Sequence, residues 1–357
     1  MTGHHDVSII GFGAAGATLA GRPEGTGFEV YDPEFAAVLG DGASLELVAE
    51  TDAHEGPVYV PGHDALYFTT LPLRGNIPAP GTLQAAIKRL ALNGLSFPVD
   101  QSRLSVLPAD VHVPNGMTLD HGGHLVVCEQ GTRSEHARIS RVDPVTGQVE
   151  GLVDGWGGLR LNSPNDVVVR HDGTIWFTDP SYGYLQGFRP EPQLGDYVYR
   201  FDPASGRLSV VADCLDKPNG LAFSPDEHIL YIADSGANQE PGSYHVQRPH
   251  HILAFDVRDG THLAGGRLFA VITPGFPDGL AVDRAGRVYA SSPSGVQVFN
   301  PAGDLIGQIS VPGAVNFTFG GPAGDVLFIT TDTAIWAAVL STAAAPGQRH
   351  DHVPERW

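Results

Sequence analysis

Four polar side chains in this sequence share a setting that could bind a metal ion. Glu55, Asn165, Asn219 and Asp278 each stand at the start of a short apolar segment. Two offer carboxylate oxygens and two offer amide oxygens, a donor set that favours a hard divalent cation such as Ca²⁺, Mg²⁺ or Mn²⁺ over thiolate-binding metals. The two carboxylates also balance the charge of such an ion. On physical grounds alone, the same groups could instead hold ordered water.

The spacing around these residues indicates that they occupy equivalent positions in a repeat. Copies of one unit, such as PNDVVVRHDGTIWFTD from Pro164, recur six times, and each start is followed 14 or 15 residues later by the end of a second apolar strand. The starts are 38 to 60 residues apart, which brackets the roughly 40–50 residues of a four-stranded propeller blade. The six starting residues are Glu55, Asn115, Asn165, Asn219, Asp278 and Asn316.

These repeats predict an all-β fold, a six-bladed β-propeller with four-stranded blades. The sequence has 45 Gly and 28 Pro and shows no helical periodicity over the twelve or so residues that a helix needs. Innermost strands line the channel of a propeller, so the six starting residues should converge near one end of its axis. Further strands are expected at 86–92, 197–203, 208–213, 252–257 and 267–272.

We expect three parts in the chain: a leader at 1–44, the propeller at 45–340 and a tail at 341–357. A strand at 28–32 or 44–50 could complete the last blade and close the ring. Gly11, Gly13 and Gly16 match a dinucleotide-binding fingerprint, with the acidic Asp32 downstream. No repeated strand-helix units follow, so we expect no dinucleotide cofactor.

Several segments resemble the gluconolactonase and SMP-30 (regucalcin) family, including its lactonohydrolases. The likeness rests on residues 160–184, 217–235 and 276–303 and on the HEGPVY segment from His54, and it covers roughly residues 45–340. It implies a six-bladed propeller with one catalytic divalent cation, usually Ca²⁺, with Mg²⁺, Mn²⁺ or Zn²⁺ as alternatives. The family's Glu, two Asn and Asp ligands correspond to Glu55, Asn165, Asn219 and Asp278.

Two departures from the family pattern concern the substrate. Ala53-His54 stands where many gluconolactonases have Trp-Ala, which is closer to lactonohydrolases acting on aldono- or pantoyl lactones, and Gln130 stands where a His is often found. We expect His54 itself to pack between strands, because neighbours on a strand face opposite ways and Glu55 faces the channel.

The predicted activity is hydrolysis of a small sugar-type, aldono or pantoyl lactone to its hydroxy acid. Asp278 is the expected base that helps to deprotonate the attacking water. The expected substrate contacts at the same end of the channel are Asn115, Glu129, Asp179, Tyr182 and Asn316. Phosphotriester hydrolysis on the same metal and a non-enzymatic interaction module are the alternatives.

Composition excludes several classes of partner. The net charge of −19, from 40 acidic and 21 basic residues, disfavours binding to nucleic acid or to anionic membranes. Cys128 and Cys214 are too few for a disulfide framework and are read as buried strand residues. No segment reaches transmembrane length, and a cytoplasmic protein is expected, with export as the alternative. The sequence does not indicate an oligomeric state.

Overall fold

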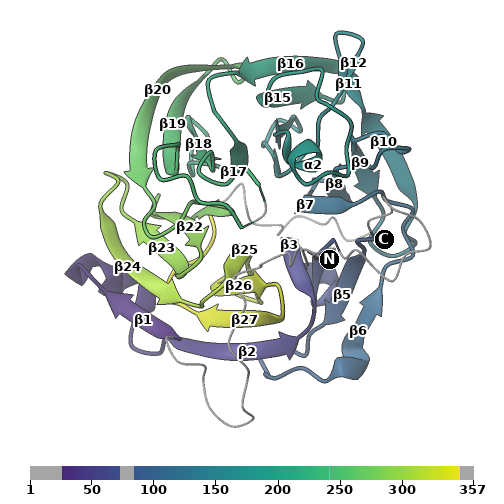
Figure 1. Ribbon diagram of the computed structural model, residues 1–357. Coiled ribbons are helices and arrows are strands. Elements are labelled where there is room, and N and C mark those ends of the chain that lie inside the picture. Colours follow the sequence, from purple (N-terminus) through teal and green to yellow (C-terminus); the bar gives the residue numbers. More distant parts are fainter. Residues whose placement is uncertain (1–25, 73–83, 241, 346–357) are drawn as a thin grey trace, which may run out of the picture.

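Six antiparallel sheets surround a central axis in the computed structural model (Figure 1), which describes residues 26–72, 84–240 and 242–345. Each of the first three blades runs outward in chain order from its inner strand. The strands of these blades are β3 (Ala53–Val60), β4 (Ala65–Thr70), β5 (Ile87–Ala91) and β6 (Leu104–Val106); β7 (Pro114–Leu119), β8 (Leu125–Glu129), β9 (Arg138–Val142) and β10 (Val149–Val153); and β13 (Val167–Val169), β14 (Ile175–Asp179), β15 (Tyr197–Asp202) and β16 (Arg207–Ala212).

The last three blades repeat this order, and two of them take a strand from the N-terminal region, which is a fifth strand in one blade and the fourth strand in the other. These blades contain β17 (Pro218–Phe223), β18 (Ile229–Asp234), β19 (His251–Arg258) and β20 (His262–Val271); β21 (Leu280–Val282), β22 (Val288–Ser292), β23 (Gly295–Phe299), β24 (Leu305–Ser310) and β1 (Gly27–Val30); and β25 (Ala314–Gly320), β26 (Val326–Thr331), β27 (Ala334–Val339) and β2 (Ser44–Glu50). The predicted six-bladed all-β propeller is therefore confirmed.

The ring closes through β2, which pairs with β27 from Ser44 opposite Val339 to Glu50 opposite Ala334. Of the two segments considered for closure, 44–50 completes the last blade, whereas β1 joins the outer edge of the preceding blade instead. At the other end of the described chain, Ala345 donates a backbone hydrogen bond to Val282. Segments on both sides of 45–340 thus pack on the propeller, and the Gly11–Gly16 fingerprint lies outside the described residues.

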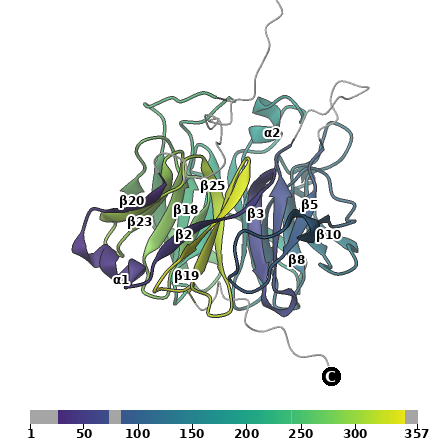
Figure 2. The same ribbon diagram turned by 90° about the horizontal axis from the view of Figure 1, so that it is seen from below.

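Short elements fill the connections between strands. They are the 3₁₀ turns η1 (Pro33–Phe35), η2 (Pro61–His63) and η3 (Gln101–Arg103), the helices α1 (Ala36–Leu39) and α2 (Tyr182–Leu185), and the hairpin of β11 (Gly155–Trp156) with β12 (Leu159–Arg160). Figure 2, a side view, shows α2 at one end of the propeller axis. In the part of the chain that the structure describes, no helix is long and apolar enough to cross a membrane.

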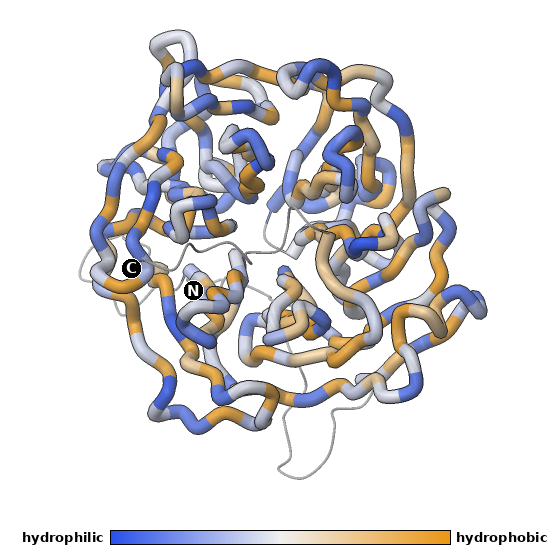
Figure 3. Tube along the Cα trace, turned by 180° about the vertical axis from the view of Figure 1, so that it is seen from behind, coloured by the Kyte–Doolittle hydropathy of each residue, from blue (hydrophilic) through white to orange (hydrophobic). Residues whose placement is uncertain are grey.

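The core lies between the blades, because each sheet is covered on both faces by its neighbours. Every residue of β14, for example, is buried, and the ring of Trp176 packs edge-on against Phe223 of the next blade at 5.5 Å. Outer strands such as β10 and β20 are more exposed, and hydrophilic as well as hydrophobic residues occur along the rim (Figure 3). Cys128 is buried in β8 as predicted, but Cys214 is exposed because β16 ends before it, at Ala212.

Candidate active site

The six starting residues of the repeat occupy equivalent places where the inner strands begin. Four of them lie inside inner strands, at β3, β7, β17 and β25, and Asn165 and Asp278 lie two residues before β13 and β21. The pairing register shifts at each of the four inside strands, for example between Pro114 and Met117 and between Pro218 and Leu221. Such β-bulges re-aim a side chain away from the regular alternation. The bulges explain how equivalent residues turn toward the axis.

Glycines that follow the starting residues allow neighbouring inner strands to approach closely. The amide of Gly220 donates to the carbonyl oxygen of Asp278 at 3.0 Å, and a Cβ atom on Gly220 would lie 2.2 Å from that oxygen. Gly116 stands in the same relation to Asn165, with a backbone hydrogen bond of 2.8 Å. The Asn-Gly pairs that begin these two inner strands are therefore blade-to-blade contacts rather than hairpin turns.

Glu55 and Asp278 bring two carboxyl groups together in this ring. The carboxyl group of Asp278 lies within reach of the side chains of Asn219 and Glu55, and the negative charge of Asp278 acts in turn on Glu55. Burial raises the pKa of Glu55 well above its ordinary value, and the charge of Asp278 adds to that rise. Desolvation likewise raises the pKa of Asp278 to about 6. Two adjacent carboxyl groups with raised pKa values form a site where a cation would be strongly stabilising.

Two amide oxygens of the ring, one on the predicted ligand Asn165 and one on the predicted substrate contact Asn115, have no partner among the described residues. Oδ1 of Asn165 and Oδ1 of Asn115 are buried and accept no hydrogen bond from any described residue. A buried polar atom without a partner is costly, so each oxygen is suited to a cation or to a ligand's donor group. No three His, Cys, Asp or Glu side chains gather into a metal cluster within the described ranges. A cation here would therefore need amide oxygens, as the sequence predicts, and the residues present fit a hard divalent ion.

Glu129 and Asp179, two predicted substrate contacts, are already engaged by the protein. Both side chains are fully buried. The Glu129 carboxylate accepts from the His112 amide at 2.7 Å and pairs with Arg138 at 2.8 Å, and the Asp179 carboxylate accepts from the amides of two residues that precede Asn165. Through these contacts the two carboxylates hold the segments that precede the ring residues in place. Because their oxygens are already hydrogen-bonded to the protein, the geometry does not favour direct contact with a substrate.

Asp234 plays the same part in the fourth blade and was not singled out in the sequence. Its carboxylate accepts from the amides of Asp216 and Lys217, both at 2.9 Å, just before Asn219. The repeat spacing could have identified Asp234, since it stands 15 residues after Asn219 in the same register that relates Asp179 to Asn165. A carboxylate at the end of the second strand is thus a repeated device for fixing the approach to a ring residue.

The other predicted substrate contacts differ in what they can offer. Asn316 is occupied, because Nδ2 donates to Oε2 of Glu55 at 2.7 Å and Oδ1 accepts from the Phe317 amide. Asn115 keeps its free Oδ1, and Tyr182 on α2 keeps a buried hydroxyl that receives no hydrogen bond from the described chain. Of the predicted contacts, Asn115 and Tyr182 therefore retain unused polar atoms.

A family model for the SMP-30/gluconolactonase/LRE-like region matches residues 53–333, most of the chain and all six ring residues. The chain belongs to this family. It is 33% identical to a gluconolactonase of Zymomonas mobilis, over 84% of this chain and 82% of that protein. It is 29% identical to the lactonohydrolase oryL of Aspergillus oryzae, over 82% of this chain and 69% of the relative.

A solved structure of a Xanthomonas campestris gluconolactonase shares the fold of this SMP-30/gluconolactonase family member. The two chains are 37% identical with a TM-score of 0.70, and the match covers 88% of this chain and 94% of the other. The resemblance predicted from the sequence is confirmed by this structure and by the family match.

His54 differs from the expectation that it packs between strands. In this family member, Nδ1 of His54 lies 2.8 Å from Oδ1 of Asp332, a residue in the turn between β26 and β27. Both side chains are about a quarter exposed, at 23% and 26%. The positive charge of a protonated His54 would lower the pKa of Asp278, and the negative charge of Asp332 raises it. Sequence reasoning missed Asp332, whose partner is 278 residues away.

Proposed function

We propose that this family member is a metal-dependent lactone hydrolase that converts a small sugar-type, aldono or pantoyl lactone to its hydroxy acid. The lactone-hydrolysing class is confirmed by relatives such as the Zymomonas mobilis gluconolactonase. The metal, its ligands, the particular lactone and the role of each residue are our proposal. Its ligands are Glu55, Asn165, Asn219 and Asp278.

One observation carries the metal proposal: a buried amide oxygen without a partner, on Asn165, belongs to the same ring as two interacting carboxyl groups with raised pKa values. Protons relieve the repulsion between the carboxyl groups in the absence of an ion, and a divalent cation would replace them. We propose Ca²⁺ as this ion, because it accepts mixed carboxylate and carbonyl oxygens in flexible geometry, whereas Mg²⁺ demands a near-ideal octahedron.

Asp278 is the proposed base. It is more accessible than Glu55, because it remains partly exposed where Glu55 is buried. Its carboxylate would take a proton from water as the water oxygen forms a bond to the lactone carbonyl carbon. Cleavage of the ring C–O bond then leaves an alkoxide that receives the proton, so one water is consumed for each hydroxy acid formed. A bound divalent cation would polarise the carbonyl group and offset the developing negative charge.

Asn115 and Tyr182 are the proposed substrate contacts that retain free polar atoms. A sugar lactone carries several hydroxyl groups, each able to donate to the Asn115 oxygen or to accept from the Tyr182 hydroxyl. Asn316, by contrast, is proposed to orient Glu55, since both of its amide atoms are used.

A panel of lactones tests the function. We expect hydrolysis of at least one sugar-type, aldono or pantoyl lactone, loss of that activity after dialysis against a chelator, and recovery with Ca²⁺. Thermal unfolding provides a second readout, because an ion at one hundred times its Kd stabilises the folded state by about 2.7 kcal/mol. If neither the activity nor the melting temperature changes after treatment with the chelator, the metal proposal is overturned. Turnover of a phosphotriester but of no lactone would overturn the lactonase assignment.

A further inference from the structure

The buried hydroxyl group of Tyr182 is available to donate a hydrogen bond to a substrate. Tyr182 is only 5% exposed, and its Oη atom has no hydrogen-bond partner in the described chain. Burial raises the pKa of Tyr182 well above its ordinary value, the negative charges of Asp278 and Asp234 add to the rise, and the side chain of Ser235 acts against it. The hydroxyl group therefore keeps its proton and lies within the electrostatic reach of the ring, where a ligand oxygen could accept from it.

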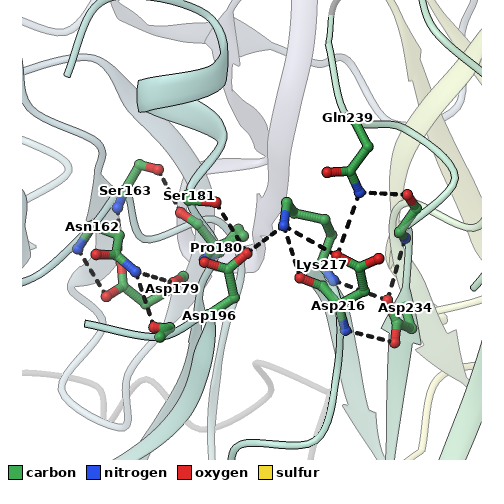
Figure 4. A network of polar contacts seen from close by, with 12 residues as sticks. Asn162, Ser163, Asp179, Pro180, Ser181, Asp196, Asp216, Lys217, Asp234 and Gln239 are labelled. Atoms are coloured by element: carbon green, nitrogen blue, oxygen red, sulfur yellow. Dashed lines mark hydrogen bonds and ion pairs between the residues drawn. The ribbon is translucent and has the colours of Figure 1, made fainter. Parts of the chain in front are cut away.

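A single carboxylate oxygen ties the α2 segment to the next blade. Oδ2 of Asp196 accepts a hydrogen bond from the hydroxyl of Ser181 at 3.0 Å, and Ser181 immediately precedes Tyr182. The same oxygen lies 2.6 Å from Nζ of Lys217 (Figure 4). The Lys217 and Asp196 side chains are only 9% and 13% exposed, so solvent screens this pair far less than a surface ion pair.

Lys217 is in turn fixed to the ring segment of the fourth blade. It stands two residues before Asn219, its amide donates to Asp234, and Nζ also contacts Oδ1 of Asp216 at 3.2 Å. Figure 4 shows the resulting chain of contacts, which runs from the end of β14 at Asp179 on one side to the end of β18 at Asp234 on the other. Only Lys88 and Lys217 are lysines in this sequence, and Lys217 is placed at the junction of two blades beside the ring.

We propose that the ion pair of Asp196 and Lys217 is a positioning contact that holds Tyr182 over the ring and thereby sets specificity for lactones that carry hydroxyl groups. This inference rests on the proposed lactone hydrolase. Asp196 and Lys217 act through Tyr182, whose hydroxyl would donate to a ring substituent of the lactone. A lactone of the same ring size without hydroxyl groups has no partner for Tyr182. Its KM should therefore not change when the Asp196–Lys217 ion pair is removed.

The test compares D-glucono-δ-lactone with δ-valerolactone, which has the same ring and no hydroxyl groups. Tyr182→Phe, Lys217→Met and Asp196→Asn should each raise KM for gluconolactone roughly fivefold to tenfold, the loss of one uncharged hydrogen bond, with kcat less affected. KM for δ-valerolactone should stay unchanged. Lys217→Arg should largely restore the wild-type KM. The double variant Tyr182→Phe, Lys217→Met should be no worse than either single variant, because both remove the same interaction.

Arg248→Gln is the matched control, since it breaks the 2.8 Å pair of Arg248 with Asp216 in the same network without touching α2. It should leave both KM values unchanged. Equal rises in KM for the two lactones, or additive effects in the double variant, would indicate a general structural role and overturn the inference. A wild-type protein that hydrolyses neither lactone nor any other in the panel would instead overturn the proposed function, which is a different result.

Discussion

The side-chain amide of Asn316 donates a 2.7 Å hydrogen bond to Oε2 of Glu55, joining residues 261 positions apart in the chain. Asn316 lies near the start of β25, the inner strand of the last blade, and Glu55 lies in β3, the inner strand of the first, so the bond joins the two blades that meet where the propeller closes. It fixes one oxygen of a buried carboxyl group whose nearest charged neighbours are also acidic. The contact therefore spans the first and last blades and also orients a proposed metal ligand.

Replacing Asn316 should weaken metal binding without removing a ligand. Asn316→Leu leaves Glu55 without this donor, and loss of an outer contact of that kind costs about tenfold to a hundredfold in metal affinity. Isothermal titration with Ca²⁺ measures the change. Asn316→Gln, which keeps the amide group, serves as the comparison and should retain more affinity than Asn316→Leu. Identical affinities for wild type and Asn316→Leu would remove Asn316 from the site.

The substitution Asp278→Asn removes the negative charge of the side chain but keeps its size and shape. The amide keeps the size of the side chain but cannot accept a proton as a base, so kcat on the best lactone should fall by at least about a hundredfold. Metal affinity should also fall, because one of two ligand charges is lost. Steady-state kinetics at saturating Ca²⁺ distinguishes the two effects, and a full rate under those conditions would exclude Asp278 as the base.

Metal affinity should depend on pH with a defined sign. The pKa of Asp278 is raised to about 6 and that of Glu55 lies well above its ordinary value when no ion is bound. Below these values a proton occupies the site and must be displaced by the cation. Affinity for Ca²⁺ should therefore be greatest at neutral pH and above, and should fall by about tenfold for each pH unit once a single proton is displaced. Titrations between pH 5 and 8 measure this slope, and a flat profile would contradict the assignment of the carboxyl pair.

The ring was predictable because a propeller repeats one unit. A constant register of 14 or 15 residues identified the six starting residues, and donor chemistry then separated Glu55 and Asp278 from the asparagines. The register also predicts a polar residue at the end of each second strand. Its role was not predictable, since the sequence does not indicate whether Glu129 and Asp179 face a substrate or the backbone amides of the preceding loop. Burial and hydrogen bonding resolve this in favour of the amides.

Contacts between side chains of different blades could not be predicted from the sequence. The pairing of His54 with Asp332 and that of Lys217 with Asp196 depend on how segments of different repeats meet, and no local sequence pattern indicates these contacts. The same limit applies to Cys214, because strand length at the outer edge of a blade is set by packing against its neighbour. Local periodicity specifies the blades, whereas these contacts arise only once the blades are assembled.

The glycine after a ring residue offers a test of that assembly. A Cβ atom at Gly220 would lie 2.2 Å from the carbonyl oxygen of Asp278, so Gly220→Ala must push the inner strands of two blades apart. We expect a loss of about 1–3 kcal/mol in the free energy of unfolding, the usual cost of overpacking, measured by urea denaturation. Gly62→Ala is the matched control, because its Cβ would meet no atom within 4 Å.

The same substitution should reduce activity by more than its effect on stability explains. Gly220 adjoins Asn219 and bonds to the backbone of Asp278, so displacement of either strand moves two proposed metal ligands at once. Under conditions where the Gly220→Ala protein is fully folded, kcat/KM should remain well below that of Gly62→Ala, and added Ca²⁺ should recover part of it by drawing the ligands together. Full activity in the folded Gly220→Ala protein would show that the ring tolerates a shift between blades, contrary to the close approach on which the site depends.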